Sequence, residues 1–119
     1  MPDKTFTLSL NSLYCYFVEE NDYDDVFLKF KGKKVWPKKK RMMHIPMDST
    51  IDLNVEIKGV KEGQAVVIEL WDHDWLSSND LLGTFSFEIE GVSGPFTTDM
   101  KRNKEETDKA KYTLEWEVF

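Results

Sequence analysis

Three aspartates carry the clearest chemical signal in this 119-residue sequence. Asp72 and Asp74 stand two positions apart where an apolar run ends, and Asp80 follows just before the Leu81-Leu82-Gly83 segment. A loop between two strands would bring these carboxylates together around its base. Calcium binds through about six to eight oxygen ligands, which are carboxylates, carbonyls and waters in a flexible geometry. The residue types and their spacing therefore predict a calcium site in this loop.

A second acidic segment runs from Glu19 to Asp25, with five carboxylates in seven positions. Carboxylates packed closely repel one another and raise each other's pKa unless another charge offsets them. A hard divalent cation does so with oxygen ligands alone, whereas zinc and softer metals favour Cys and His. Calcium is therefore the cofactor that both acidic loops predict.

The segments that must position these loops alternate between apolar and polar residues. A period of two is typical of strands that bury one face, as in antiparallel sheets. Segment 64–71 is more continuously apolar and is predicted to be a central strand, whereas the polar segment 98–111 is predicted to be a loop with one helical turn. Gly and Pro punctuate the alternating runs, which are residues 6–10, 26–30, 51–57, 85–89 and 112–118.

This pattern predicts six to eight strands without a long helix, and we expect an all-β, antiparallel, eight-stranded β-sandwich. No linker or internal repeat divides the sequence, so a single domain over residues 1–119 is predicted. No apolar run reaches the roughly 20 residues needed to cross a bilayer, and the first residues show no signal-peptide pattern. Cys15 is the one cysteine; it is expected in the core and suits a reducing, cytoplasmic compartment.

The charge is segregated along the chain. The net charge is −6, yet segment 31–41 holds seven of the 16 basic residues and no acidic one. The remainder is strongly acidic, which disfavours nucleic acid as a partner. Two interpretations of the segregation stay open: a cation-binding end with a separate basic surface, or two solvated faces of a sandwich.

Residues 71–87, WDHDWLSSNDLLGTFSF, resemble the third calcium loop of C2 domains, a family of β-sandwiches that mostly bind calcium and phospholipid. The family pattern is D-x-D, five residues, D, two residues and G, and Asp72, Asp74, Asp80 and Gly83 fill it. The resemblance spans roughly residues 5–119. It implies a C2-like β-sandwich with the three aspartates as calcium ligands.

The sequence after the first acidic segment resembles the D-P-Y-V-K strand opening of the same family. The resemblance makes Asp25 a calcium ligand, with Val26 in place of the usual proline. The other ligand of this loop usually lies six residues earlier, which implies Glu19. A different loop length would give the role to one of three neighbours, Glu20, Asn21 or Asp22.

One strand, about residues 5–18, precedes the first acidic loop. This arrangement resembles the circularly permuted, type II topology of the family, in which the last strand, here residues 111–119, fills the remaining place.

The resemblance implies a peripheral membrane protein that docks on anionic phospholipid. Trp75 and Leu76, in the middle of the third loop, are predicted to insert into the membrane, because Trp suits the interface between water and lipid. The alternative for Trp75 is packing over its own loop. A basic patch offers a second contact with lipid or a partner, or else it guards an edge strand against aggregation; it consists of Lys33, Lys34, Lys38, Lys39 and Lys40.

Two other classes of function remain as alternatives. The irregular first loop, with Glu19 and Val26, favours a calcium-independent module for protein interaction or assembly. Paired carboxylates with His73 as a base would suit glycoside hydrolysis, but no nucleophile, phosphate loop or cofactor motif accompanies them, so an enzyme is not expected. His73 is predicted to be a solvent-exposed spacer, and His44 a partly buried surface residue.

Overall fold

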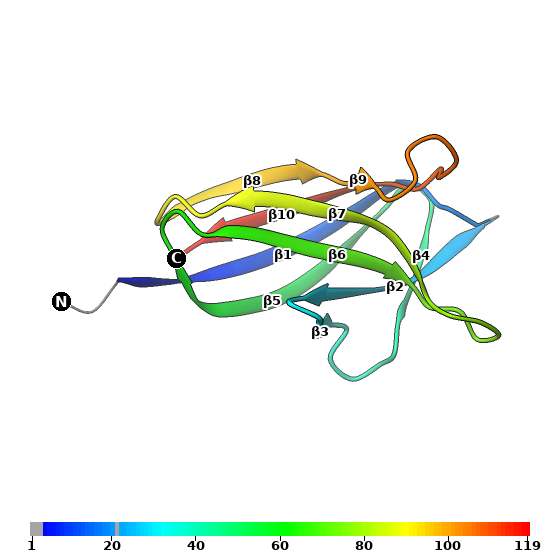
Figure 1. The fold of residues 1–119 in the computed structure, drawn as a ribbon, viewed down its shortest axis with the longest axis horizontal. Coiled ribbons are helices and arrows are strands. Elements are labelled where there is room, and N and C mark those ends of the chain that lie inside the picture. Colours follow the sequence, from blue (N-terminus) through cyan, green and yellow to red (C-terminus); the bar gives the residue numbers. More distant parts are fainter. Residues whose placement is uncertain (1–3, 21) are drawn as a thin grey trace.

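The structure is a computed structural model that describes residues 4–20 and 22–119. Its strands form two antiparallel sheets that face one another, which confirms the predicted β-sandwich (Figure 1). The described residues contain no helix, and their ten strands are β1 (Thr5–Phe17), β2 (Tyr23–Phe30), β3 (Lys33–Trp36), β4 (Met43–Pro46), β5 (Ser49–Lys61), β6 (Ala65–Asp72), β7 (Asp80–Glu88), β8 (Ser93–Asp99), β9 (Lys101–Arg102) and β10 (Lys111–Val118).

The four-stranded sheet has the order β5-β1-β10-β8, and the other has the order β3-β2-β6-β7-β9, with β4 also paired to β2. Strand β6 is central in its sheet, as its apolar sequence predicts. The first and last strands lie side by side, since Leu10 of β1 pairs with Trp116 of β10. The type II topology itself stays a prediction.

The strand count exceeds the predicted eight because short strands form where loops were expected. The expectation of a loop is wrong for the start of segment 98–111: β8 continues to Asp99, and β9 pairs with β7. The expected turn follows, where the amide of Asp108 donates to the carbonyl of Lys104 at 2.8 Å.

The core lies between the sheets and follows the alternation along much of each strand, with interruptions of which the one in β1 is an example. In β1, Leu8 and Leu10 are fully buried, and then the register against both neighbouring strands shifts between Leu10 and Ser12. Because of this bulge the inward positions move by one residue, so Leu13 and Cys15 complete the buried face. Burying side chains of this size contributes roughly 1.5–3 kcal/mol each.

A two-residue turn joins β2 to β3 at the edge of the larger sheet. Lys31 and Gly32 both have positive φ, 51° and 78°, as a tight hairpin of this length requires. The turn places the basic residues of β3 on an edge strand of the sheet.

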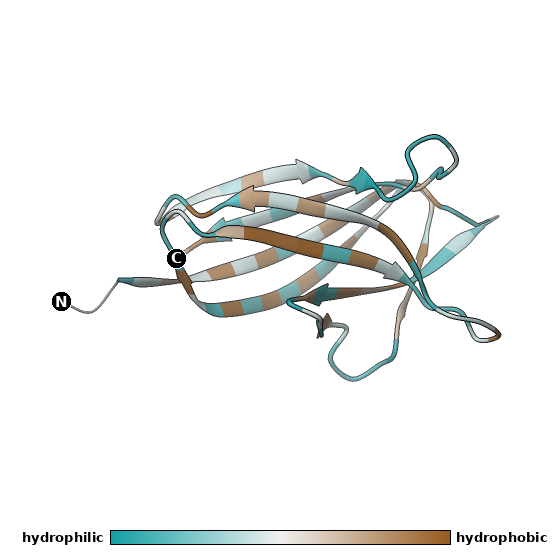
Figure 2. Cartoon of the chain, viewed as in Figure 1, coloured by the Kyte–Doolittle hydropathy of each residue, from teal (hydrophilic) through white to brown (hydrophobic). Residues whose placement is uncertain are grey.

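Four connections lie at one end of the sandwich, on the right of Figure 1. Their described residues are 18–20 with 22, 47–48, 73–79 and 103–110. The tip of the β6–β7 loop is coloured as hydrophobic in Figure 2, although it projects from the molecule. No helix suited to crossing a membrane occurs in the part of the chain that the structure describes.

Candidate functional site

The two acidic loops face one another across a pocket of about 430 Å³. We call it the acidic pocket. Five of its lining residues are carboxylates from both loops, which the pairing of β2 with β6 brings side by side. The complete lining is Glu20, Asp22, Tyr23, Asp25, Asp72, His73, Asp74, Trp75 and Leu76.

Asp72 ends β6 at the bottom of this pocket and is 8% exposed. Its Oδ1 accepts a hydrogen bond of 3.0 Å from the amide of Asp25. Burial, together with the negative charges of Asp24, Glu20 and Asp25, raises the pKa of Asp72 to about 7, against the effect of that hydrogen bond. The protein alone thus disfavours the charged form, which a cation beside it would stabilise.

Asp74 shapes the β6–β7 loop from within. Its Oδ1 accepts from the amides of Leu76 and Ser77 at 2.9 and 3.2 Å, and its Oδ2 accepts from the Ser77 hydroxyl at 2.7 Å. The hydrogen bond from the Leu76 amide, followed by that from the Ser77 hydroxyl, lowers the pKa of Asp74 below its usual value. The amide of Asp74 in turn donates to Asn79 Oδ1 at 3.0 Å. The carboxylate is charged and ordered, but three donors already occupy it.

Asp25 stands at the start of β2, opposite His44 of β4. Its Oδ1 lies 2.9 Å from Nδ1 of His44, and the ring of Tyr23 packs against the imidazole with centroids 3.6 Å apart. The His44 side chain is 59% exposed, so the expectation of a partly buried residue is wrong. Asp25 therefore has one imidazole neighbour and otherwise faces the pocket.

Two of the predicted ligands do not line the acidic pocket. Oε1 of Glu19 accepts from the amides of Lys109 and Ala110 at 2.8 and 3.1 Å, which turns this carboxylate toward the start of β10. Asp80 pairs with Asp72 across the strands and is exposed. Their roles as ligands stay predictions. Among the alternatives to Glu19, Glu20 and Asp22 do line the pocket, whereas Asn21 lies outside the described residues.

Asp24, which the acidic motifs did not single out, is fully buried. Its carboxylate accepts from the amides of Glu19 and Glu20 and, at 2.6 Å, from the hydroxyl of Tyr112. Burial raises the pKa of Asp24, against these three hydrogen bonds. The alternation of inward and outward residues in β2 could have identified Asp24. Val26 points inward, so the residue two positions before it, Asp24, points inward as well.

In residues 4–20 and 22–119, no three Asp, Glu, His or Cys side chains form a ready-made metal centre. The donor types nevertheless fit calcium, because hard carboxylate oxygens crowd around the buried Asp72 without a Lys or Arg in the lining. The residues that would hold the ion are Asp25, Asp72 and Asp74. Calcium would supply the positive charge that these carboxylates lack, and Asp74 would have to exchange some of its present donors.

The tip of the β6–β7 loop is apolar and open. Trp75 is 64% exposed and Leu76 97% exposed. The Trp75 ring also packs edge-on against His73 of its own loop, with centroids 4.6 Å apart, and its insertion into a membrane stays a prediction. His73 is not the expected solvent-exposed spacer: its Nε2 is buried and has no hydrogen-bond partner among the described residues. Met47, in the β4–β5 turn at the same end of the sandwich, is also exposed, at 47%.

The five lysines of the predicted basic patch are exposed, on β3 and in the loop that follows. Nζ of Lys34 donates to the carbonyl of Lys40 at 2.5 Å, which folds this loop back on β3. A hollow of about 480 Å³ beside it is lined by Lys40 and Arg41 and shares Asp25 and Trp75 with the acidic pocket. The basic loop therefore lies next to the acidic one, which sequence order did not indicate.

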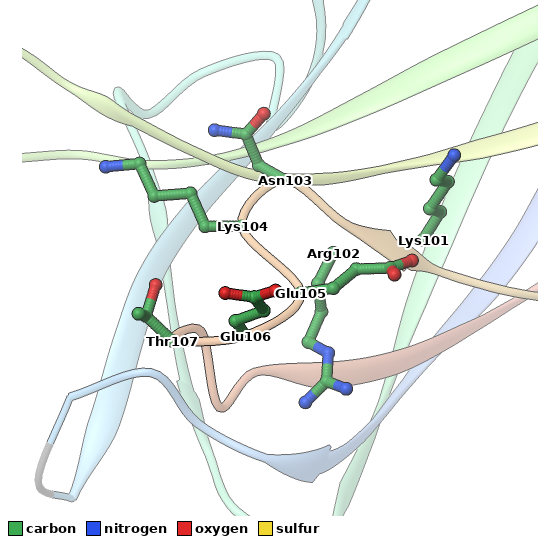
Figure 3. A pocket seen from close by; sticks show the side chains of 7 residues that line it. All are labelled: Lys101, Arg102, Asn103, Lys104, Glu105, Glu106 and Thr107. Carbon is green, nitrogen blue, oxygen red and sulfur yellow. The ribbon is translucent and has the colours of Figure 1, made fainter.

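Another hollow, of about 510 Å³, lies along the segment from Lys101 to Thr107 (Figure 3). Basic and acidic side chains from this one segment surround it. All seven lining residues are exposed, so it is an open bend of the chain rather than an enclosed site.

Comparisons with known proteins give a likeness in fold without a likeness in sequence. No family model matches the sequence, and no curated protein matches it. A solved C2 domain of plant extended synaptotagmin 1 is 15% identical, with a TM-score of 0.60 over 99% of this chain and 95% of that one. Another structure, described as a C2 domain, is 11% identical, with a TM-score of 0.52 over 96% of each chain. At such low identities the likeness establishes the fold alone.

Proposed function

We propose that this chain, which has the fold of C2 domains, is a single calcium-binding module that docks on anionic phospholipid membranes through its two acidic loops. The observation that carries the proposal is the acidic pocket, which Asp25 and Asp74 line together with a buried Asp72. Carboxylates at such density cost free energy that a bound cation would offset.

The membrane part of the proposal rests on the neighbours of the pocket. Trp75 and Leu76 line one side of it and are exposed to solvent. With a cation in place, the negative potential of the pocket would no longer repel anionic headgroups, and the apolar tip would enter the interface. The protein would then be cytoplasmic and peripheral to a membrane.

The basic patch would add long-range attraction to an anionic surface, worth about 1 kcal/mol per lysine near it. Changing Lys38, Lys39 and Lys40 together to Gln should weaken binding to anionic vesicles and reduce its dependence on salt. If Lys33 and Lys34 of β3 instead protect this edge strand, changing those two to Gln should cause aggregation and leave vesicle binding unchanged.

A melting curve in calcium against chelator tests the ion. A ligand that binds only the folded state stabilises it by mass action, so the midpoint should rise on the order of 10 °C at about 100 times Kd. Asp72→Asn combined with Asp74→Asn should abolish the rise. Asp52→Asn, which removes an exposed acid on β5, is the matched control and should retain it.

One set of contacts favours a second candidate, a calcium-independent module for protein interaction or assembly. Glu19 and Asp74 already hold backbone amides, and no ready-made metal centre occurs in the described residues. Calorimetry without calcium heat up to millimolar concentration would support this candidate against the first.

Catalysis has less support. C2 domains are generally binding modules. In addition, the base that a hydrolase would need, His73, has its Nε2 buried without a partner among the described residues.

A further inference from the structure

The acids of the β1–β2 loop and the start of β2 face two different surroundings. Glu20, Asp22 and Asp25 line the acidic pocket. Asp24 points into the core, and Glu19 points to the start of β10. One short loop thus holds an outer set of acids that face solvent and an inner set that faces protein.

The inner set is satisfied by hydrogen bonds that close the loop. Oδ1 of Asp24 accepts from the amides of Glu19 and Glu20 at 3.0 and 3.2 Å, and Oδ2 accepts from the Tyr112 hydroxyl. A buried carboxylate is tolerated only when such donors surround it. Tyr112 is itself fully buried and belongs to β10, so the loop is fastened to a rigid strand of the opposite sheet.

Glu19 makes a second attachment to the same strand. Its Oε1 accepts from the amides of Lys109 and Ala110, the two residues that precede β10. The Ala110 amide needs such a partner because Ala110 is fully buried where the chain enters the core. The β1–β2 loop and the β9–β10 segment are therefore joined through side-chain oxygens.

We propose that Asp24 and Glu19 are positioning residues of the acidic pocket: they fasten the β1–β2 loop to β10 and so present Glu20, Asp22 and Asp25 to a cation. This inference rests on the proposed function for the identity of the ligand. The fastening itself concerns the folded chain and can be measured without calcium.

Amide hydrogen exchange in chelator tests the fastening. Tyr112→Phe removes the hydroxyl that donates to Asp24 and keeps the buried ring. Exchange of the Glu19 and Glu20 amides should then become about tenfold faster, the effect expected from losing one hydrogen bond to a charged group. Tyr14→Phe is the control, since it removes the hydroxyl that donates to Asp48 at the same end of the molecule. Equal exchange in Tyr112→Phe and the wild type would overturn the proposal.

A pair of variants at Glu19 separates positioning from ligation. Gln retains an oxygen that can accept from Lys109 and Ala110 but has no charge, whereas Ala has neither. If Glu19 is a positioning residue, Glu19→Gln should bind calcium as the wild type does, and Glu19→Ala should bind calcium about tenfold more weakly. Equal weakening in both variants would make Glu19 a calcium ligand and overturn its positioning role.

The results distinguish a failure of the proposed function from a failure of the proposed fastening. If the wild type bound no calcium while Tyr112→Phe still loosened the Glu19 and Glu20 amides, the proposed function would fall and the fastening would stand. The Lys109 and Ala110 amides then replace calcium as the readout for Glu19: faster exchange in Glu19→Ala but not in Glu19→Gln supports the role, and equal exchange in both overturns it.

Discussion

The amide of Asp25 donates to Oδ1 of Asp72 at 3.0 Å, and so joins the two acidic loops directly. The amide of His73, the residue after Asp72, donates to the carbonyl of Asp25 at 2.6 Å. The bond from His73 joins backbone to backbone and so continues the pairing of β2 with β6 past Val26 and Asp72, the last paired residues at this end. The bond from the Asp25 amide holds the Asp72 carboxylate against the start of β2, at the floor of the acidic pocket.

The first prediction concerns pH in the absence of calcium. The pKa of Asp72 is raised from 3.8 to about 7 by burial, so between these values the folded chain holds a proton that the unfolded chain has released. Unfolding then releases a proton, and the free energy of unfolding should fall as the pH rises from about 4 to about 7. Denaturant titrations at several pH values in chelator measure this fall, and Asp72→Asn should make it shallower. Superimposable pH profiles for the two proteins would contradict the assignment.

The same proton should compete with calcium. A cation binds the carboxylate form, so calcium affinity should increase between about pH 6 and about pH 8, and binding at the lower pH should release protons. Calorimetry in buffers of different ionisation enthalpy measures that release. Calcium affinity that did not change over this range would exclude Asp72 as a ligand.

The second prediction concerns Gly83, the glycine of the D-x-D…D-x-x-G pattern. Gly83 pairs with Arg102 of β9. A Cβ added to Gly83 would collide with the carbonyl of Lys101 and lie 2.6 Å from Cγ of Met100. We expect Gly83→Ala to cost about 1–3 kcal/mol of stability, as overpacking does. Gly32→Ala is not a suitable control because the φ of Gly32 is positive. Ser86 lies on β7, as Gly83 does, and is exposed, so Ser86→Ala should cost little stability and serves as the control. Equal stabilities of the two variants would show that β9 moves aside.

The third prediction concerns the apolar tip. Trp75→Ala and Leu76→Ala should each weaken binding to anionic vesicles in calcium by about tenfold, because each removes apolar area that would enter the membrane. Their melting points should hardly change, since these side chains are 64% and 97% exposed. Val92→Ala is the control: Val92 is 71% exposed at the other end of β7 and should not affect binding. Full binding by both tip variants would leave the membrane contact to other residues.

Local patterns in the sequence predicted much of the fold. Alternation placed the strands, because the side chains of a strand face opposite sides in turn, and the continuous apolar run identified β6 as central. The bulge in β1 was not predictable, since it depends on how Asn11 fits between β5 and β10. There its amide group donates to Glu117 at 3.0 Å and its Oδ1 accepts from Ser9 at 2.7 Å.

The candidate site was predicted in part. The spacing of Asp72 and Asp74 and the strand opening at Asp25 identified three acids that the structure brings to one pocket. The direction of Glu19 could not be inferred from spacing, because its partners lie 90 and 91 residues further along the chain. Only the folded arrangement of β1 beside β10 brings them together.

The most direct test of the central claim is sedimentation of the protein with vesicles of phosphatidylcholine and phosphatidylserine, in calcium and in chelator. The proposed function predicts that the protein sediments with these vesicles in calcium, stays in solution in chelator, and loses the difference when Asp72 and Asp74 are changed to Asn. Equal sedimentation in calcium and chelator, or sedimentation of the double variant like that of the wild type, would contradict calcium-dependent docking through the acidic pocket.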